Sequence, residues 1–200
     1  MAFTFFFRDL HTIELMVNHV LPTIAGRSVV RIWDAGCAMG PELYTIAIVF
    51  SEKMGYFGFK NLKIDATDLD ENNTFGSIVT AGVYPAEELS RIPREIFKKY
   101  FEPEGTPGQF RIIESLRNRI NFRKHDLLSL NPIGSEYSLI VCKNVLLHFT
   151  HEERINVIKM YYDSLAPGGY FAMEQTQTLP SELSSLFEKV VSDAQLFKKK

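Results

Sequence analysis

The 200-residue chain is within the size range of one domain, and its 46% hydrophobic content is sufficient for one packed core. A formal net charge of -2 argues against a general nucleic-acid-binding protein. Its two cysteines, Cys37 and Cys142, occur without a C-x-x-C motif or a histidine cluster, which argues against a metal site and favours a reducing, cytoplasmic location. No apolar run approaches the ~20 residues of a membrane-spanning helix, so we expect no membrane insertion.

The N-terminal part of the chain is rich in phenylalanine and leads into a predicted helix. Apolar side chains recur at helical spacing through residues 10–21, and Pro22 marks the expected end. Arg8 directly follows three phenylalanines. A lone arginine is usually a solvated cation, but a guanidinium also binds a carboxylate through two hydrogen bonds. The residues alone leave both roles open.

A strand, a glycine turn and a helix follow one another in residues 29–42. The β-branched run at the start predicts a buried strand, since parallel strands carry apolar runs. Gly36 and Gly40 allow a sharp turn, and Pro41 suits the start of a helix that we expect to end near Gly55. This arrangement favours a nucleotide-type site, although an ordinary strand-to-helix turn is the alternative. The D-x-G-x-x-x-G spacing favours a ligand without a pyrophosphate.

An acidic residue ends the second predicted strand, at residues 62–68. In doubly wound nucleotide sites an acid at this place holds the ribose hydroxyls. The alternative is that Asp68 caps the next helix. We expect Asp70 to be that cap, which leaves Asp68 available to a ligand.

Residues 102–108 are the most turn-rich part of the chain. The apolar residues of segments 110–112 and 120–122 bracket a polar stretch, which predicts a small antiparallel hairpin. Because a βαβ fold does not need this piece, we expect an inserted β-subdomain at about residues 105–124.

The rest of the chain continues the alternation of strands and helices. A buried strand at residues 137–142 ends just before Asn144, which we expect at the carboxyl edge beside the glycine turn. Residues 150–153 match the capping box that opens a helix. Three later elements complete the fold: a strand at residues 170–173, a helix near 181–186, and a terminal strand pair around Val190 and Leu196. The alternation predicts a three-layer α/β fold with a mostly parallel sheet.

Together these segments resemble the CheR family of chemotaxis receptor methyltransferases, which belongs to the Rossmann-like group that uses S-adenosylmethionine. The matching motifs come in the family's order: residues 4–8 are similar to T-x-F-F-R, 33–47 to W-S-A-G-C-A-T-G-E-E-P-Y-S-I-A, 66–70 to A-T-D-I-D, 82–84 to G-x-Y, and 141–149 to F-C-R-N-V-M-I-Y-F. The resemblance covers almost the whole chain.

The resemblance implies one methyltransferase domain over residues 1–200, with a Rossmann-like methyltransferase fold and the inserted hairpin as a docking subdomain. The implied cofactor is S-adenosylmethionine, with S-adenosylhomocysteine as the product. The implied reaction is methylation of glutamate carboxylates on chemoreceptor-like proteins. Apart from the resemblance, we expect a cytoplasmic monomer. Because the chain begins at the T-x-F-F-R motif, we also expect the family's N-terminal helical domain to be missing.

The resemblance also implies the site residues: Thr4 and Arg8 at the methionine end, with Arg8 as the catalytic residue near either the cofactor carboxylate or the incoming substrate acid; Gly36 in the cofactor loop; Glu42 at the methionine ammonium; Asp68 at the ribose; Asp126 and Leu127 beside the adenine; and Asn144 and Val145 where the methyl group is presented. No metal is implied.

Several positions differ from the family's pattern: Asp34 replaces a serine, Pro41 a glutamate, Lys143 an arginine and His148 a tyrosine, and Ala2 stands where the family tends to have a cofactor-contacting asparagine. A glutamate with a reference pKa of about 4.3 is already ionised at neutral pH. We therefore favour His148 as a hydrogen-bonding wall residue over a general base. Two other hypotheses remain: a cofactor-binding sensor or adaptor without turnover, and a methyltransferase for a small-molecule acid.

Overall fold

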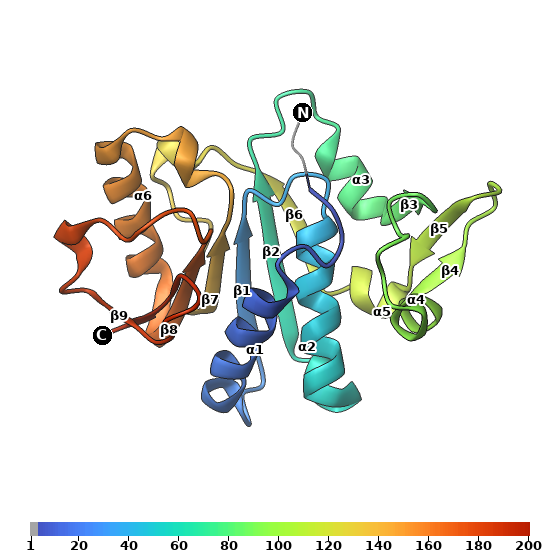
Figure 1. The fold of residues 1–200 in the computed structure, drawn as a ribbon, viewed down its shortest axis with the longest axis horizontal. Coiled ribbons are helices and arrows are strands. Elements are labelled where there is room, and N and C mark those ends of the chain that lie inside the picture. Colours follow the sequence, from blue (N-terminus) through green and yellow to red (C-terminus); the bar gives the residue numbers. More distant parts are fainter. Residues whose placement is uncertain (1–3) are drawn as a thin grey trace.

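The computed structural model describes residues 4–200, and Ala2 lies outside the described residues. A seven-stranded sheet runs through its centre in the order β6-β2-β1-β7-β8-β10-β9 (Figure 1). The first five of these strands are parallel, and β10 and β9 are antiparallel. Their bounds are β1 Val30–Ala35, β2 Leu62–Asp68, β6 Ile120–Lys124, β7 Tyr137–Cys142, β8 Leu165–Met173, β9 Phe187–Lys189 and β10 Leu196–Lys199.

Helices cover both faces of this sheet. On one face the apolar side chains of α1 (Leu10–Ile24), α2 (Pro41–Phe59) and α3 (Phe75–Ala81) share a buried cluster with β1 and β2. On the other face α6 (His151–Ser164) packs against β7 and β8. Successive side chains of a strand point to opposite faces, so a strand covered on both sides carries mostly apolar residues. The predicted three-layer α/β fold with a mostly parallel sheet is confirmed.

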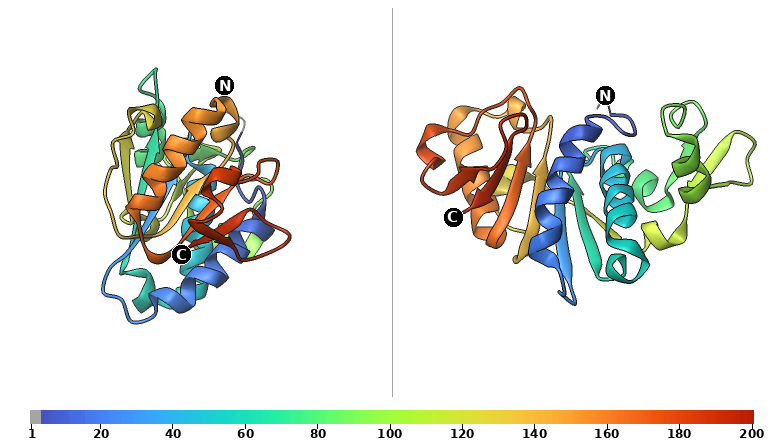
Figure 2. Two further views of the ribbon diagram at one scale, coloured as in Figure 1. Left: turned by 90° about the vertical axis from the view of Figure 1, so that its left-hand side faces the viewer. Right: turned by 60° about the horizontal axis from the view of Figure 1, so that its bottom comes forward.

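A second sheet stands apart from the first, beyond α2 and α3 (Figures 1 and 2). It has the order β3-β5-β4 and is antiparallel. We call it the small sheet. Its strands are β3 Val83–Pro85, β4 Phe101–Pro103 and β5 Gln109–Ile112, and it is accompanied by α4 Arg94–Tyr100 and α5 Glu114–Arg117.

The hairpin predicted for segments 110–112 and 120–122 is wrong. Strand β5 pairs with β3 and β4, whereas β6 pairs in parallel with β2 and belongs to the central sheet. The polar stretch between them includes helix α5 instead of a tight turn. Alternating apolar residues are equally compatible with a hairpin strand and with an edge strand of a parallel sheet, so the pattern did not determine the partner.

Other boundaries differ in detail. Helix α1 continues two residues past Pro22, and α2 continues to Phe59 through a non-helical Gly55 at φ 67° and ψ 171°. Between residues 181 and 186 there is only a 3₁₀ turn, η3 (Ser181–Leu183), followed directly by β9. The predicted terminal strand pair is present as β9 and β10. Within residues 4–200, no helix combines the length and the apolar character that crossing a membrane requires.

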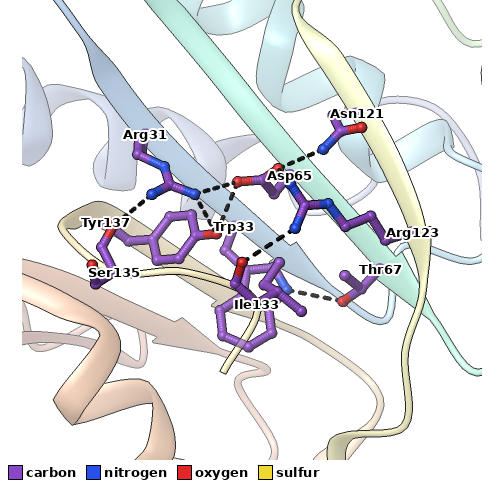
Figure 3. A network of polar contacts seen from close by, with 9 residues as sticks. All are labelled: Arg31, Trp33, Asp65, Thr67, Asn121, Arg123, Ile133, Ser135 and Tyr137. Carbon is purple, nitrogen blue, oxygen red and sulfur yellow. Dashed lines mark hydrogen bonds and ion pairs between the residues drawn. The ribbon is translucent and has the colours of Figure 1, made fainter. Parts of the chain in front are cut away.

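A polar network on one face of the central sheet ties four parallel strands together (Figure 3). Asp65 on β2 lies at its centre and accepts hydrogen bonds from Arg31 at 2.9 Å, the Tyr137 hydroxyl at 2.8 Å and the Asn121 amide at 2.9 Å. Arg123 lies 3.5 Å from the same carboxylate. Burial acts to raise the pKa of Asp65, but the hydrogen bonds outweigh burial and lower it.

Removing the Asp65 charge is expected to destabilise the protein in a pH-dependent manner. A lowered folded-state pKa contributes stability above the unfolded pKa of about 3.9, and the contribution is lost as the pH falls through the folded value. Asp65→Asn should therefore lower the free energy of unfolding at pH 7 by about 2–3 kcal/mol. Urea unfolding at pH 7 and pH 3 measures the effect, and an equal loss at both pH values would contradict this assignment.

Candidate active site

The loops that follow β1, β2, β6 and β7, together with Thr4 and Arg8, line one cavity at the carboxyl edge of the sheet. Its volume is about 580 Å³, which is typical of small-molecule sites. Strand β1 lies between β2 and β7, so the cavity is at the point where the strand order reverses. All nine predicted site residues line this cavity: Thr4, Arg8, Gly36, Glu42, Asp68, Asp126, Leu127, Asn144 and Val145.

The glycine turn after β1 lies very close to its neighbours. The N–H groups of Gly36 and Cys37 donate to the Thr67 carbonyl at 2.7 and 3.0 Å. Gly36 has φ +94°, and a Cβ at this position would overlap the Val145 side chain. Only glycine combines that backbone conformation with that contact. The turn therefore requires glycine for steric reasons.

The acid at the end of β2 holds the next part of the turn. Asp68 accepts hydrogen bonds from the N–H groups of Ala38 at 2.9 Å and Asp70 at 3.1 Å. Ala38 is in the left-handed region at φ +48°, a conformation that costs a non-glycine residue roughly 1–3 kcal/mol. The Asp70 carboxylate accepts the N–H groups of residues 74–76, where α3 begins. The predicted cap at Asp70 is confirmed, and Asp68 lines the cavity.

The aromatic N-terminal segment, residues 4–8, is fixed against the start of α2. The Phe7 N–H donates to the Thr45 hydroxyl at 3.0 Å, and this hydroxyl donates to the Pro41 carbonyl at 2.7 Å. Phe6 is fully buried. These contacts bring Arg8 to the wall of the cavity although it is far in sequence from the other lining residues.

A buried lysine joins Asp9, directly after the N-terminal segment, to the start of α2. Lys143 follows β7, its side chain is 2% exposed, and its Nζ lies 2.7 Å from Glu42 and 3.0 Å from Asp9. Burial acts to lower the pKa of Lys143, but the two carboxylates outweigh burial and raise it. The sequence marked Lys143 only as a departure from the family. Its place next to Asn144, on the same sheet edge as Glu42, is the signal that would have identified the pair.

A buried acid interacts electrostatically with this ion pair. Asp34 is 1% exposed, and neither carboxylate oxygen has a hydrogen-bond partner within residues 4–200. Burial raises the pKa of Asp34 well above its usual range, and the nearby Glu42 charge raises it further. The Glu42–Lys143 ion pair lines the cavity.

Comparison with known proteins identifies the family. The profile described as "CheR methyltransferase, SAM binding domain" matches residues 2–196. The chain belongs to this family. It is 28% identical over 187 residues to the chemotaxis protein methyltransferase Cher2 of Pseudomonas putida, which covers 88% of this chain and 66% of that protein. It is 30% identical over 186 residues to chemotaxis protein methyltransferase 1 of Pseudomonas aeruginosa, with the same shares of 88% and 66%.

A third CheR relative gives the same result. The chemotaxis protein methyltransferase of Borreliella burgdorferi is 29% identical over 185 residues, which cover 88% of this chain and 64% of that protein. The chain thus spans slightly less than two thirds of the length of these curated relatives. Membership of the CheR family confirms the Rossmann-like methyltransferase fold and S-adenosylmethionine as the cofactor, as the sequence motifs implied.

The lining of the cavity fits this cofactor. S-adenosylmethionine carries ribose hydroxyls, an adenine and a zwitterionic amino acid. The cavity has an acid, Asp68, an apolar rim, and the Glu42–Lys143 ion pair. The rim was not predicted from the sequence: Leu69, Leu128 and Leu147 line the cavity and remain 46%, 42% and 41% exposed. Large apolar side chains that stay exposed around a cavity favour contact with a ligand. His148 also lines the cavity, beside Leu147.

Proposed function

We propose that this domain transfers the methyl group of S-adenosylmethionine to glutamate carboxylates of chemoreceptor-like proteins. The observation that carries the proposal is the convergence of Arg8, the Glu42–Lys143 pair and Asp68 on one cavity at the carboxyl edge of the sheet. The named relatives, which are chemotaxis protein methyltransferases, support the same activity.

The methionine end of the cofactor would lie against the N-terminal segment and the start of α2. Glu42 carries a negative charge suited to the methionine ammonium, and Lys143 beside it carries the positive charge suited to the carboxylate. Thr4 adds a hydroxyl to this wall of the cavity. In the cofactor, the ammonium and the carboxylate are attached to the same carbon atom. Glu42 and Lys143, whose charged groups lie 2.7 Å apart, would therefore be close enough together to contact both.

The nucleoside end would lie along the loops after β2 and β6. Asp68 would accept hydrogen bonds from the ribose hydroxyls, since its carboxylate lines the cavity and is already held by backbone N–H groups. Asp126 and Leu127 would lie beside the adenine, with the Leu127 side chain buried. Asn144 and Val145 would border the methyl group, next to the glycine turn.

Methyl transfer from a sulfonium to a carboxylate depends mainly on positioning the carboxylate against the methyl group. The bound cofactor supplies an electrophilic methyl group on a sulfonium, and a carboxylate oxygen that displaces the sulfur needs no proton transfer. Arg8 would orient the incoming carboxylate through a bidentate contact, and the walls around Asn144 would hold it in line. His148 would serve as a hydrogen-bonding residue of the cavity wall, because an ionised glutamate carries no proton for a general base to remove.

We further propose that residues 1–200 act as one domain, with the small sheet as its insertion, and that the protein is a cytoplasmic monomer. Two reduced, buried cysteines, Cys37 and Cys142, support a reducing compartment. Light scattering during size-exclusion chromatography tests the oligomeric state.

Two measurements test the proposed function. Calorimetry should detect binding of S-adenosylhomocysteine, and absence of binding at high micromolar ligand would refute a methyltransferase. Tritiated S-adenosylmethionine with chemoreceptor fragments should then label the fragments in a base-labile form, as an ester requires. Binding without labelling would favour a sensor or adaptor. Labelling of small carboxylic acids alone would favour a small-molecule enzyme.

A further inference from the structure

The G-x-Y motif at residues 82–84 has no place in the cavity described above. Its tyrosine, Tyr84, lies on β3 of the small sheet, and its side chain is buried with 2% exposure. The Tyr84 hydroxyl donates a hydrogen bond of 2.7 Å to the Met39 carbonyl, which belongs to the glycine turn. A residue of the small sheet therefore holds the backbone of the cofactor loop from outside the cavity.

The second glycine of the turn accommodates this contact. Gly40 has φ +98°, and a Cβ on it would stand 2.7 Å from the Tyr84 hydroxyl oxygen. Any side chain at Gly40 would thus push the tyrosine away from Met39. The glycine and the tyrosine fit each other, which gives the wide D-x-G-x-x-x-G spacing a structural reason.

The same tyrosine also contacts the N-terminal segment. The Phe6 ring meets the Tyr84 ring edge-on at a centroid distance of 4.9 Å and meets Phe101 of the small sheet at 5.7 Å. Phe6 lies between Thr4 and Arg8, two of the cavity-lining residues. The Tyr84 ring contacts the N-terminal segment, and its hydroxyl contacts the glycine turn. Tyr84 itself is not among the residues that line the cavity.

We propose that Tyr84 is a positioning residue that holds the glycine turn and the N-terminal segment in the geometry that binds S-adenosylmethionine, and so couples the small sheet to the cavity. The proposal rests on the proposed function for the identity of the ligand. The Met39 carbonyl is one residue beyond Ala38, whose strained backbone is held by Asp68. Asp68 and Tyr84 thus hold the turn at consecutive residues.

The chain contains a matched control for this hydroxyl. Tyr44 on α2 is fully buried, and its hydroxyl donates to a backbone carbonyl, that of Val79 in α3, at 2.6 Å. The Tyr44 and Tyr84 rings are nearly perpendicular, with their centroids 6.1 Å apart. Tyr44→Phe and Tyr84→Phe therefore remove the same group from the same kind of partner in the same part of the core. Only Tyr84→Phe releases the glycine turn.

Comparison of these two variants tests the proposal. Both should lower the melting temperature by a similar amount, about 2–4 °C. Calorimetry should show S-adenosylhomocysteine binding weakened about three- to tenfold in Tyr84→Phe, the value of one hydrogen bond, and unchanged in Tyr44→Phe. Equal affinities for the two variants, at equal melting temperatures, would overturn the proposal.

Hydrogen exchange gives a readout that does not need the ligand. Backbone amides of residues 36–40 should exchange faster in Tyr84→Phe than in the wild type and should be unchanged in Tyr44→Phe. If the wild type fails to bind S-adenosylhomocysteine, the proposed function fails. The exchange of the turn then still decides the positioning role: faster exchange in Tyr84→Phe alone supports it, and equal exchange in both variants refutes it.

Discussion

Replacing Asp68 with alanine is expected to weaken S-adenosylhomocysteine binding by about 100-fold, measured by calorimetry. A hydrogen bond to a charged group contributes about 1.5–3 kcal/mol, and the ribose offers two hydroxyls to this carboxylate. The substitution also removes the acceptor for the Ala38 N–H, which loosens the left-handed turn residue in the cofactor loop. Asp68→Asn keeps the shape of the side chain and one acceptor oxygen, so it should weaken S-adenosylhomocysteine binding by only about tenfold.

The neighbouring acid provides the control for this prediction. Asp70 lies on the same loop, but its carboxylate accepts the N–H groups at the start of α3. Asp70→Ala should lower the free energy of unfolding by about 1–2 kcal/mol through loss of a helix cap and leave affinity nearly unchanged. If Asp68→Ala binds the product as tightly as Asp70→Ala does, the ribose partner lies elsewhere.

The convergence of the site residues was predictable because a topological rule brings them together. In a parallel sheet the residues that follow adjacent strands meet at one edge, so Gly36, Asp68 and Asn144 were expected beside one another and line one cavity. The cap at Asp70 was predictable for a similar reason, since the partners of a cap lie within a few residues of it.

The missed features depend on partners that are distant in sequence. The Lys143–Asp9 pair spans 134 residues, and no local pattern signals it. The contact between Tyr84 and Met39 required knowing where the small sheet lies. Strand β6 was given the wrong partner because a period of two residues specifies a strand but not its neighbour. Local chemistry was therefore predicted better than long-range pairing.

Replacing Lys143 with methionine is expected to destabilise the protein by about 3 kcal/mol, because it removes the charge of a lysine that is 2% exposed and leaves Glu42, 13% exposed, without its counterion. Urea unfolding at pH 7 measures the loss. Lys99 provides a matched control, since its Nζ lies 2.6 Å from Glu52 but its side chain is 59% exposed. Lys99→Met should lower the free energy of unfolding by at most about 1 kcal/mol, because exposed ion pairs contribute little to stability. Equal losses in the two variants would contradict a stabilising buried pair.

A double-mutant cycle with Glu42→Gln separates the ion pair from the packing of the lysine stem. If the loss in Lys143→Met comes from the unpaired carboxylate, Glu42→Gln in that background should recover about 1–2 kcal/mol. The pH dependence gives a second check. Because the folded-state pKa of Lys143 is raised, its contribution is fully present below the unfolded pKa of about 10.4 and is lost as the pH rises through the folded value. The stability difference between wild type and Lys143→Met should therefore shrink above pH ~10, whereas packing alone would keep it constant.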